Sequence, residues 1–171
     1  MNSVLTKIAE SIIPASLLLP IRFAWLKAKG KLDGEMLHVG SLLKNRRRFI
    51  DVGANAGIYS YFFAKDFEKV EAFEPIKEIT RHISNLSQEN ISIHDVALSN
   101  SQGELLFYIP SRNGVLITGL ASLEPRDGPC EKRTVEVKTI DSYEFSSVDL
   151  IKIDVEGHEY NVLDGARNTL A

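Results

Sequence analysis

Hydrophobic runs of two kinds alternate along the chain after about residue 48. Short runs rich in branched and aromatic residues predict parallel strands at residues 49–52, 70–73, 91–98 and 148–155. Runs with apolar residues three or four positions apart predict helices at residues 58–65, 76–86 and 159–170. Strands that alternate with helices are typical of a parallel sheet with crossover helices. We therefore predict an α/β domain over residues 48–171, with a doubly wound, mostly parallel sheet.

The segment at about residues 103–140 interrupts this alternation. Residues 104–109 predict a strand, and Val135 and Val137 alternate imperfectly with polar residues. Together they predict an inserted antiparallel pair. Residues 110–129 between them are rich in Gly, Ser and Pro, so we expect a mobile loop of the kind that covers substrates at this end of such sheets.

An apolar stretch at residues 11–21 precedes the predicted domain. It is too short to span a bilayer, and we expect Pro14 and Pro20 to break any helix through it. No small-x-small site follows it, which disfavours a signal peptide. We predict that residues 1–47 form a helical extension that packs on the domain. The alternative is a peripheral membrane contact through this stretch. Such a contact would include the residues that follow it: Trp25, Lys27, Lys29 and Lys31.

Composition narrows the classes of function. The chain has 171 residues, of which 44% are hydrophobic and 25% are charged, enough for one substantial core. Its formal charge of −3 does not indicate a nucleic-acid-binding protein. We expect the basic residues 46–48 to be solvated side chains at the start of the first strand rather than a binding patch. The single cysteine, Cys130, excludes a disulfide framework and a thiolate metal site, which favours a reducing, cytoplasmic location.

The turn after the first predicted strand, Asp-Val-Gly-Ala-Asn-Ala-Gly at residues 51–57, is typical of nucleotide binding. Gly53 permits a tight turn, Asn55 tolerates unusual backbone angles, and Gly57 lets the next helix start close to a ligand. The middle glycine of the dinucleotide fingerprint is absent, and so is the Lys-Ser or Lys-Thr of a phosphate-binding loop. An acid beside an open glycine turn suits S-adenosylmethionine, which is cationic and carries no phosphate. We therefore expect Asp51 near the amino-acid end of this cofactor.

Two further strand ends offer groups for the rest of the cofactor. Glu74 lies 23 residues after Asp51, at the end of the second strand, where a carboxylate commonly accepts hydrogen bonds from both ribose hydroxyls. At the end of the third strand, Asp95 offers a carboxylate for the exocyclic amine of adenine, and Val96 offers a backbone amide. A solvated acid at the strand end is the alternative for Asp95.

Charge is concentrated again at the last predicted strand, in Lys-Ile-Asp-Val-Glu-Gly-His-Glu at residues 152–159. Strand alternation sends Lys152, Asp154 and Glu156 to one face. A buried strand tolerates three ionisable groups only where they pair or border a site. Asp154, Glu156 and His158 are the alternative as metal ligands, but no three-ligand spacing stands out, so we predict no metal.

Three motifs in this order resemble the FkbM family of methyltransferases: the glycine turn, Phe-Glu-Pro at residues 73–75, and Lys-Ile-Asp-Val-Glu-Gly at residues 152–157. The resemblance runs from residue 49 to about residue 170 and includes Asn-Val-Leu-Asp-Gly-Ala at residues 161–166. It implies a Rossmann-like fold of the class I methyltransferase type, with S-adenosylmethionine as the cofactor. It also implies methylation of a hydroxyl oxygen on a sugar or a secondary metabolite, so that the acceptor is a small molecule or a carbohydrate.

An enzyme of this family would align the acceptor oxygen with the methyl carbon and the sulfur. A base that removes the hydroxyl proton would assist the transfer. The candidates are His158, Asp154 and Glu156, with His158 first because its titration range suits proton transfer near neutral pH. A capping or packing role on the final helix is the alternative for His158.

One departure from the family pattern leaves other functions open. The resemblance implies further strands beyond the final helix, and we expect the domain in this sequence to lack these C-terminal strands. We therefore expect the strand at residues 148–155 to lie at an unprotected sheet edge. A truncated domain of this kind could be a non-catalytic binding or assembly module. A nicotinamide-dependent oxidoreductase uses the same fold, but Gly53 and Gly57 without a middle glycine count against it.

Overall fold

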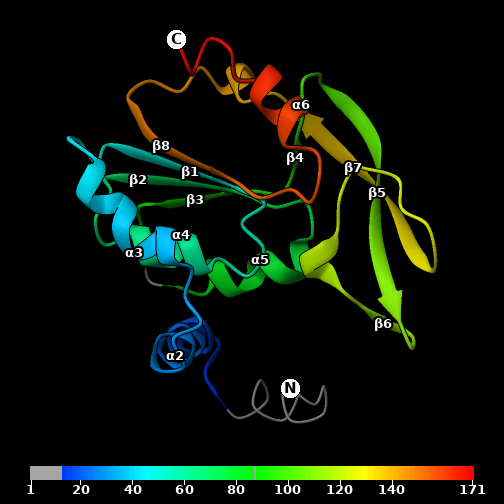
Figure 1. Ribbon diagram of the computed structural model, residues 1–171, viewed down its shortest axis with the longest axis horizontal. Helices are drawn as coiled ribbons and strands as arrows, with labels where there is room; N and C mark the ends of the chain where they lie inside the picture. The colour runs from blue at the N-terminus through cyan, green and yellow to red at the C-terminus, as the bar shows by residue number, and fades with distance from the viewer. Residues whose placement is uncertain (1–12, 87) are drawn as a thin grey trace.

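The computed structural model describes residues 13–86 and 88–171, and these residues contain two sheets (Figure 1). The first sheet is parallel, with the spatial order β3-β2-β1-β8. Its central strands are rich in branched and aromatic residues that are buried on both faces, as parallel strands require. This confirms the predicted α/β class with a parallel sheet. The strands are β1 Arg48–Val52, β2 Lys69–Phe73, β3 Ile91–His94 and β8 Val148–Ile153.

Helices cover both faces of the parallel sheet. Phe49 of β1 packs against Phe63 of α4 on one face, and α5 lies on that same face. Ile50, the next residue of β1, packs with Val162 of α6 on the other face. The alternation of side chains along β1 thus supplies both halves of the core. The helices are α4 Ile58–Phe63, α5 Lys77–Ser84 and α6 Glu159–Asp164.

The second sheet contains the inserted segment and lies beside the parallel sheet (Figure 1). Its strands follow the order β4-β7-β5-β6. β5 and β7 are antiparallel, with Gly103 opposite Val137, which confirms the predicted antiparallel pair. The elements are β4 Ala97–Leu98, β5 Gly103–Arg112, β6 Val115–Leu116, the 3-10 helix η2 Thr118–Leu120, β7 Cys130–Lys138 and the 3-10 helix η3 Asp141–Tyr143.

The predicted third strand at residues 91–98 is wrong as a single element. Its first half is β3, which pairs with β2, whereas its end is β4, which pairs with β7. The chain passes from one sheet to the other at Asp95 and Val96. Both halves have a strand-like hydrophobic pattern, so the pattern does not mark the point at which the partner changes.

The segment predicted as a loop, residues 110–129, contains regular structure. β5 continues into it and turns back into β6 at Asn113 and Gly114, which have φ values of +51° and +73°. Asn-Gly with two positive φ angles is typical of a tight hairpin turn. Further on, Tyr108 and Ser122 exchange two backbone hydrogen bonds of 2.8 and 3.1 Å. The segment is therefore folded against the second sheet.

The final helix is shorter than predicted. α6 ends at Asp164, and a Cβ on the next residue, Gly165, would overlap the backbone carbonyl of Ser99. This close approach ties the end of α6 to the end of β4. Beyond it, the Asp141 carboxylate accepts a hydrogen bond of 2.9 Å from the backbone amide of Asn168. The chain after α6 is held in turns by this contact.

Helices also occupy most of the described part of the predicted extension. α2 packs on α4 and α5 through Leu19, which is buried, and Phe23. Residues 1–12, which include the start of the predicted apolar stretch, lie outside the described residues. The helices are α2 Ala15–Ala28, α3 Gly34–His38 and the 3-10 helix η1 Val39–Leu42.

The expectation that proline breaks the first helix is half wrong. Pro14 caps α2, but Pro20 lies inside it without ending it. A proline in a helix removes the hydrogen bond to the carbonyl four residues earlier, here that of Ser16. Ser16 is exposed, so water can satisfy that carbonyl.

β8 is an edge strand of the parallel sheet. Among the described residues, β8 pairs with β1 on one side and with no strand on its other side. In the same ranges, no helix has the length and the apolar character needed to cross a membrane.

Candidate cofactor-binding and active site

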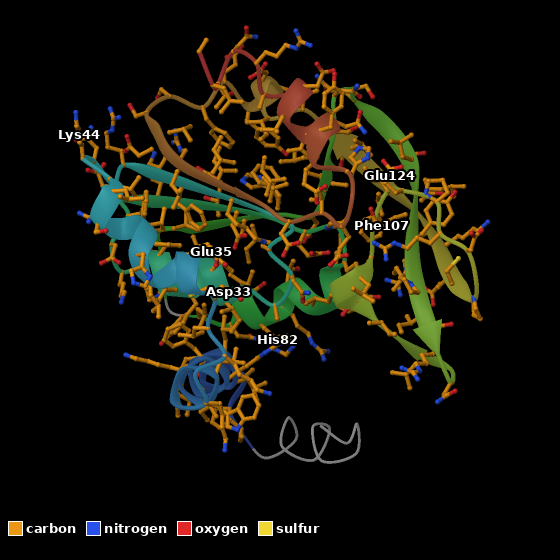
Figure 2. The ribbon with its side chains drawn as sticks, in the orientation of Figure 1. Asp33, Glu35, Lys44, His82, Phe107 and Glu124 are labelled. Atoms are coloured by element: carbon orange, nitrogen blue, oxygen red, sulfur yellow. The ribbon has the colours of Figure 1, made fainter. Side chains whose placement is uncertain are left out.

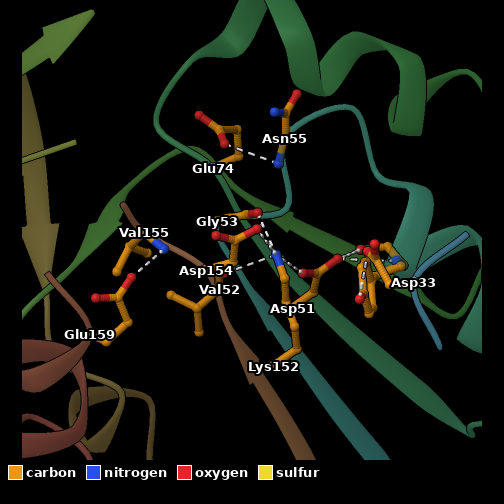
Figure 3. Close-up of polar contacts among 12 residues, drawn as sticks. Asp33, Asp51, Val52, Gly53, Asn55, Glu74, Lys152, Asp154, Val155 and Glu159 are labelled. Carbon is orange, nitrogen blue, oxygen red and sulfur yellow. Dashed lines mark hydrogen bonds and ion pairs between the residues drawn. The ribbon is translucent and has the colours of Figure 1, made fainter. Parts of the chain in front are cut away.

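A buried ion pair joins the two sequence motifs in the parallel sheet (Figure 3). Asp51 of β1 is fully buried, and its Oδ2 accepts hydrogen bonds from the amide and the hydroxyl of Ser60 at 3.1 and 2.7 Å. Its Oδ1 lies 3.2 Å from Nζ of Lys152 on β8. These partners offset the cost of burying a charge. Asp51 therefore contacts the protein itself and does not line the adjacent cavity.

Lys152 also fixes the turn after β1. Its Nζ donates hydrogen bonds to the carbonyls of Gly53 and Val52 at 2.8 and 3.3 Å. Nζ lies 5.3 Å from the ring centroid of Tyr59, within cation–π range. The Tyr59 hydroxyl donates to Asp33 at 2.9 Å, and burial together with this bond raises the pKa of Tyr59. Lys152 thus links β8 to the turn and, through Tyr59, to the segment before α3.

The glycines of the turn are required by the packing of the protein itself. Gly53 has a φ of +72°, and a Cβ there would overlap the carbonyl oxygen of Asp154. Gly57 has a φ of +82°, and a Cβ there would overlap Ile83 of α5. Gly57 therefore makes room for α5, and its expected position close to a ligand stays a prediction. Asn55 has a φ of +49°, as predicted for a residue that tolerates unusual angles.

Glu74 places a buried carboxylate at the end of β2. It is 6% exposed, and its Oε2 and Oε1 accept hydrogen bonds of 3.0 Å from the backbone amides of Asn55 and Ile76. Burial raises the pKa of Glu74 to about 7, although these two bonds and Lys152 favour the charged form. The carboxylate is therefore fixed by the backbone and changes charge near neutral pH.

A cavity of about 60 Å³ lies between the ends of the parallel strands and the second sheet. Thr118 and Gly119 of η2 cover it, and a Cβ on Gly119 would lie 3.5 Å from Nδ2 of Asn55. The η2 segment therefore lies directly over the glycine turn. The predicted site residues that line the cavity are Gly53, Asn55, Glu74, Val96, Asp154, Glu156 and His158.

His158 is buried and contacts three polar side chains, of which Asn161 lies 3.1 Å from its Nδ1. Its Nδ1 lies 2.6 Å from Oε1 of Glu124, and its Nε2 lies 2.8 Å from Oγ of Ser99. In the neutral ring with its proton on Nδ1, Nδ1 donates to Glu124 and Nε2 can accept from the Ser99 hydroxyl. Figure 2 shows Glu124 where α6 meets the second sheet. His158 thus connects the start of α6 to the inserted segment and also lines the cavity.

The three charged residues expected on one strand face separate at the end of β8. Oδ2 of Asp154 lies 3.8 Å from Nζ of Lys152. Glu156, however, has a φ of +57° and places its Oε2 3.4 Å from Arg126. The prediction of one face is wrong because β8 ends at Ile153, so strand alternation stops there. In the part of the chain that the structure describes, no three His, Cys, Asp or Glu side chains are grouped to hold a metal ion.

Of the two predicted adenine contacts at the end of the third strand, Asp95 and Val96, only Val96 lines the cavity. Asp95 lies outside the lining, and its Oδ1 accepts a hydrogen bond of 3.2 Å from the Thr80 hydroxyl. Its Oδ2 lies 3.8 Å from Nζ of Lys77. These contacts fit the alternative of a solvated acid. Val96 is buried and lines the cavity.

The basic run before β1 is engaged in ion pairs. Arg47 bonds Asp149 with both its Nε and its Nη2, at 3.0 and 2.5 Å, and these bonds lower the pKa of Asp149 to about 2. Arg48 pairs with the buried Glu71 at 3.1 Å. These contacts fit the expected strand entrance rather than a binding patch.

Two polar residues near the cavity were missed by sequence reasoning. Ser99 and Glu124 reach His158 across 59 and 34 residues of sequence. Neither residue belongs to a recognisable motif. Their role becomes visible only in the structure, where both lie next to His158.

Comparison with known proteins assigns a family to this site. The sequence model of the family described as "Methyltransferase FkbM domain" matches residues 51–171. The matched range contains all three motifs and every residue that lines the cavity. Searches among curated proteins and among solved structures found no match.

Proposed function

The chain belongs to the family of FkbM methyltransferase domains, and from this premise we propose that it methylates a hydroxyl oxygen with S-adenosylmethionine. The proposed acceptor is a small molecule or a carbohydrate. The observation that carries the proposal is Glu74, a buried carboxylate that faces a cavity beside a glycine turn. Cofactors of open α/β sheets bind at this edge, outside the carboxyl ends of the strands.

Glu74 suits the ribose of the cofactor. A charged carboxylate has about four lone-pair positions, and the amides of Asn55 and Ile76 occupy one on each oxygen. The remaining positions can accept hydrogen bonds from two neighbouring hydroxyls. Because the backbone already fixes this carboxylate, little side-chain entropy is lost on binding.

Other lining residues suit the two ends of the cofactor. Asp154 is exposed and offers a carboxylate to the ammonium group of the cofactor. We predicted this role for Asp51 from the sequence, but the carboxylate of Asp51 is engaged by Ser60 and Lys152. Val96, Phe73 and Leu98 offer an apolar surface to the flat adenine ring. We therefore place the amino-acid end near Asp154 and the adenine near Val96.

Methyl transfer requires the chain to position the acceptor and to receive a proton. When bound, the cofactor supplies a methyl carbon whose bond to sulfur breaks as the acceptor oxygen bonds to it. Nε2 of His158 is the proposed proton acceptor, since Glu124 holds the proton on Nδ1. With the ring proton on Nδ1, the Ser99 hydroxyl can donate to Nε2 at 2.8 Å, and it must then turn away or pass the proton on. Asp154 and Glu156 are the other candidate bases in the lining.

A reducing, cytoplasmic location completes the proposal. The sequence contains one cysteine, and Cys130 is half-buried with a free thiol. Proteins of oxidising compartments use paired cysteines more often than a single free one.

Isothermal titration with S-adenosylhomocysteine tests the cofactor assignment. We expect the wild-type chain to bind, and Glu74→Ala to weaken binding by about tenfold or more because charge-assisted hydrogen bonds are lost. Glu78→Ala is the matched control, since Glu78 lies on α5 outside the cavity and pairs with Arg133. We expect this control to bind as the wild-type chain does.

The other outcomes separate the competing functions. A folded chain that does not bind S-adenosylhomocysteine contradicts the proposal and favours a non-catalytic module. Preferential binding of a nicotinamide dinucleotide would favour an oxidoreductase. Gly53→Val is not a clean test, because its side chain would overlap the Asp154 carbonyl and disturb the fold.

A further inference from the structure

We propose that the outer face of α2 binds the surface of membranes that contain anionic lipids. The face consists of Leu17, Ile21 and Trp25, hereafter the α2 stripe. These residues are four positions apart, so their side chains line up along one side of the helix. They are 48%, 48% and 45% exposed, respectively. This inference is independent of the cofactor assignment.

Helix α2 has two apolar faces, and the α2 stripe is the one that no other described segment covers. On the inner face, Leu19 is 1% exposed, and the Phe23 ring packs on Tyr61 and Phe62 at centroid distances of 5.5 and 5.7 Å. Figure 1 shows α2 at the margin of the molecule, apart from both sheets. The inner contacts explain why α2 is apolar on one side. They do not explain the second apolar side. An exposed apolar surface of this kind is typical of a site that binds another molecule or a membrane.

Positive charge accompanies the α2 stripe. Residues 13–32 contain no Asp or Glu, although the whole chain carries a formal charge of −3. Nζ of Lys31 lies 5.6 Å from the ring centroid of Trp25. Tryptophan beside lysine is typical of the membrane interface, where the ring enters the headgroup region and the cations meet lipid phosphates. The exposed cations of this segment are Arg22, Lys27, Lys29 and Lys31.

A lipid surface fits the α2 stripe better than a second copy of the chain. In a symmetric dimer the same face meets itself, which would bring the cations of both copies together, and residues 13–32 contain no acid to pair with them. A membrane offers an apolar layer to the stripe and anionic headgroups to the cations. With 14 residues, α2 is too short to cross a bilayer, so the contact is peripheral.

Trp25 is the only tryptophan of the chain and therefore reports directly on this contact. The full chain is mixed with vesicles of two parts phosphatidylcholine and one part phosphatidylglycerol, or with phosphatidylcholine vesicles alone. We expect co-sedimentation and a blue shift of the Trp25 emission with the anionic vesicles. Binding to the neutral vesicles should be weaker by about tenfold, and salt should weaken binding to the anionic ones.

Matched variants locate the contact. Ile21→Gln changes the centre of the α2 stripe and should weaken binding by about tenfold. Leu42→Gln is the control, because Leu42 is 79% exposed but lies in η1, and it should bind as the wild-type chain does. A double change, Lys29→Gln with Lys31→Gln, should weaken binding to anionic vesicles only. This variant tests the proposal even if Ile21→Gln is poorly folded.

Three results would overturn the proposal. The first is a folded wild-type chain that binds neither kind of vesicle. The second is an equal loss of binding in Ile21→Gln and Leu42→Gln. The third is a doubled mass in light scattering that Ile21→Gln removes, without vesicle binding, which would assign the α2 stripe to self-association.

Discussion

Glu74 is a buried carboxylate whose charge state affects the proposed contact with the cofactor. Burial raises its pKa to about 7 from an ordinary value of 4.5. Hydroxyl groups that donate to a carboxylate stabilise its charged form. The proposed ribose contact would therefore lower the pKa of Glu74 in the bound state. Protons and the cofactor then compete for the same group.

We expect the affinity for S-adenosylhomocysteine to fall as the pH drops below about 7. Above this pH the free Glu74 carboxylate is already charged, whereas below it each binding event must release a proton. The dissociation constant should then rise by up to about tenfold per pH unit. Isothermal titration from about pH 5.5 to 8.5 measures the effect, and Glu74→Gln, which cannot ionise, should remove it. A wild-type affinity that does not vary with pH would contradict the ribose contact.

Site residues were predictable where their role depends on near neighbours in sequence. Asn55 follows from the glycine turn and Glu74 from a strand end, and both line the cavity. The role of Asp51 was not predictable from one strand, because its partner Lys152 lies opposite it on β8. The partners of His158 come from still less recognisable segments.

Gly57 shows how one residue determines the packing of two elements. It begins α4 in a left-handed conformation, with a φ of +82°. Its missing side chain lets Ile83 of α5 approach, and a Cβ would overlap the Ile83 side chain. The contact between α4 and α5 therefore depends on glycine at this position, with or without a ligand.

Gly57→Ala should lower the free energy of unfolding by about 2–4 kcal/mol, from the left-handed backbone and the overlap with Ile83. Urea denaturation measures this change. Gly40→Ala is the matched control, since a Cβ there meets nothing within 4 Å, and it should change stability by less than about 0.5 kcal/mol. Adding Ile83→Ala to Gly57→Ala should cost less than the sum of the two single changes. Equal effects of Gly57→Ala and Gly40→Ala would contradict this account of the packing.

Elements were predictable in kind but less so in extent. The strands of the parallel sheet have unmistakable hydrophobic runs, yet the run at residues 91–98 hides a change of sheet. α6 stops early because Gly165 approaches Ser99, a contact that periodicity does not contain. The turn at Asn113 and Gly114 did have a sequence signal, since Asn-Gly is the residue pair that tight hairpin turns favour.

At the scale of the whole molecule, the two sheets enclose one cavity. The parallel sheet contributes Glu74 and the glycine turn, and the second sheet contributes the η2 segment. A hydrogen bond of 2.9 Å from the Ser122 hydroxyl to the Val155 carbonyl joins the two parts. The sequence predicted the parallel sheet and one antiparallel pair of the second sheet, but not how the sheets meet, because such contacts join distant residues with no shared pattern.

The size of the cavity has a consequence for ligand entry. Its volume is about 60 Å³, whereas sites for small molecules typically measure about 300–1,000 Å³. The parallel sheet is a packed core and cannot widen easily. The η2 segment contacts the glycine turn near Asn55. We expect this segment, rather than the parallel sheet, to move when a ligand enters. Binding of the proposed cofactor therefore requires this segment to open and then to settle around the ligand.

We expect the backbone amides of residues 115–123 to exchange hydrogen rapidly in the free chain and more slowly with S-adenosylhomocysteine. Opening exposes these amides to water, and a bound ligand reduces opening by filling the space beneath them. Amides paired between β5 and β7 serve as the internal control, since they should stay protected in both states. Glu74→Ala at the same ligand concentration should keep the exchange pattern of the free chain. Binding that leaves residues 115–123 unchanged would contradict the movement of the η2 segment and would mean that the ligand enters by another route.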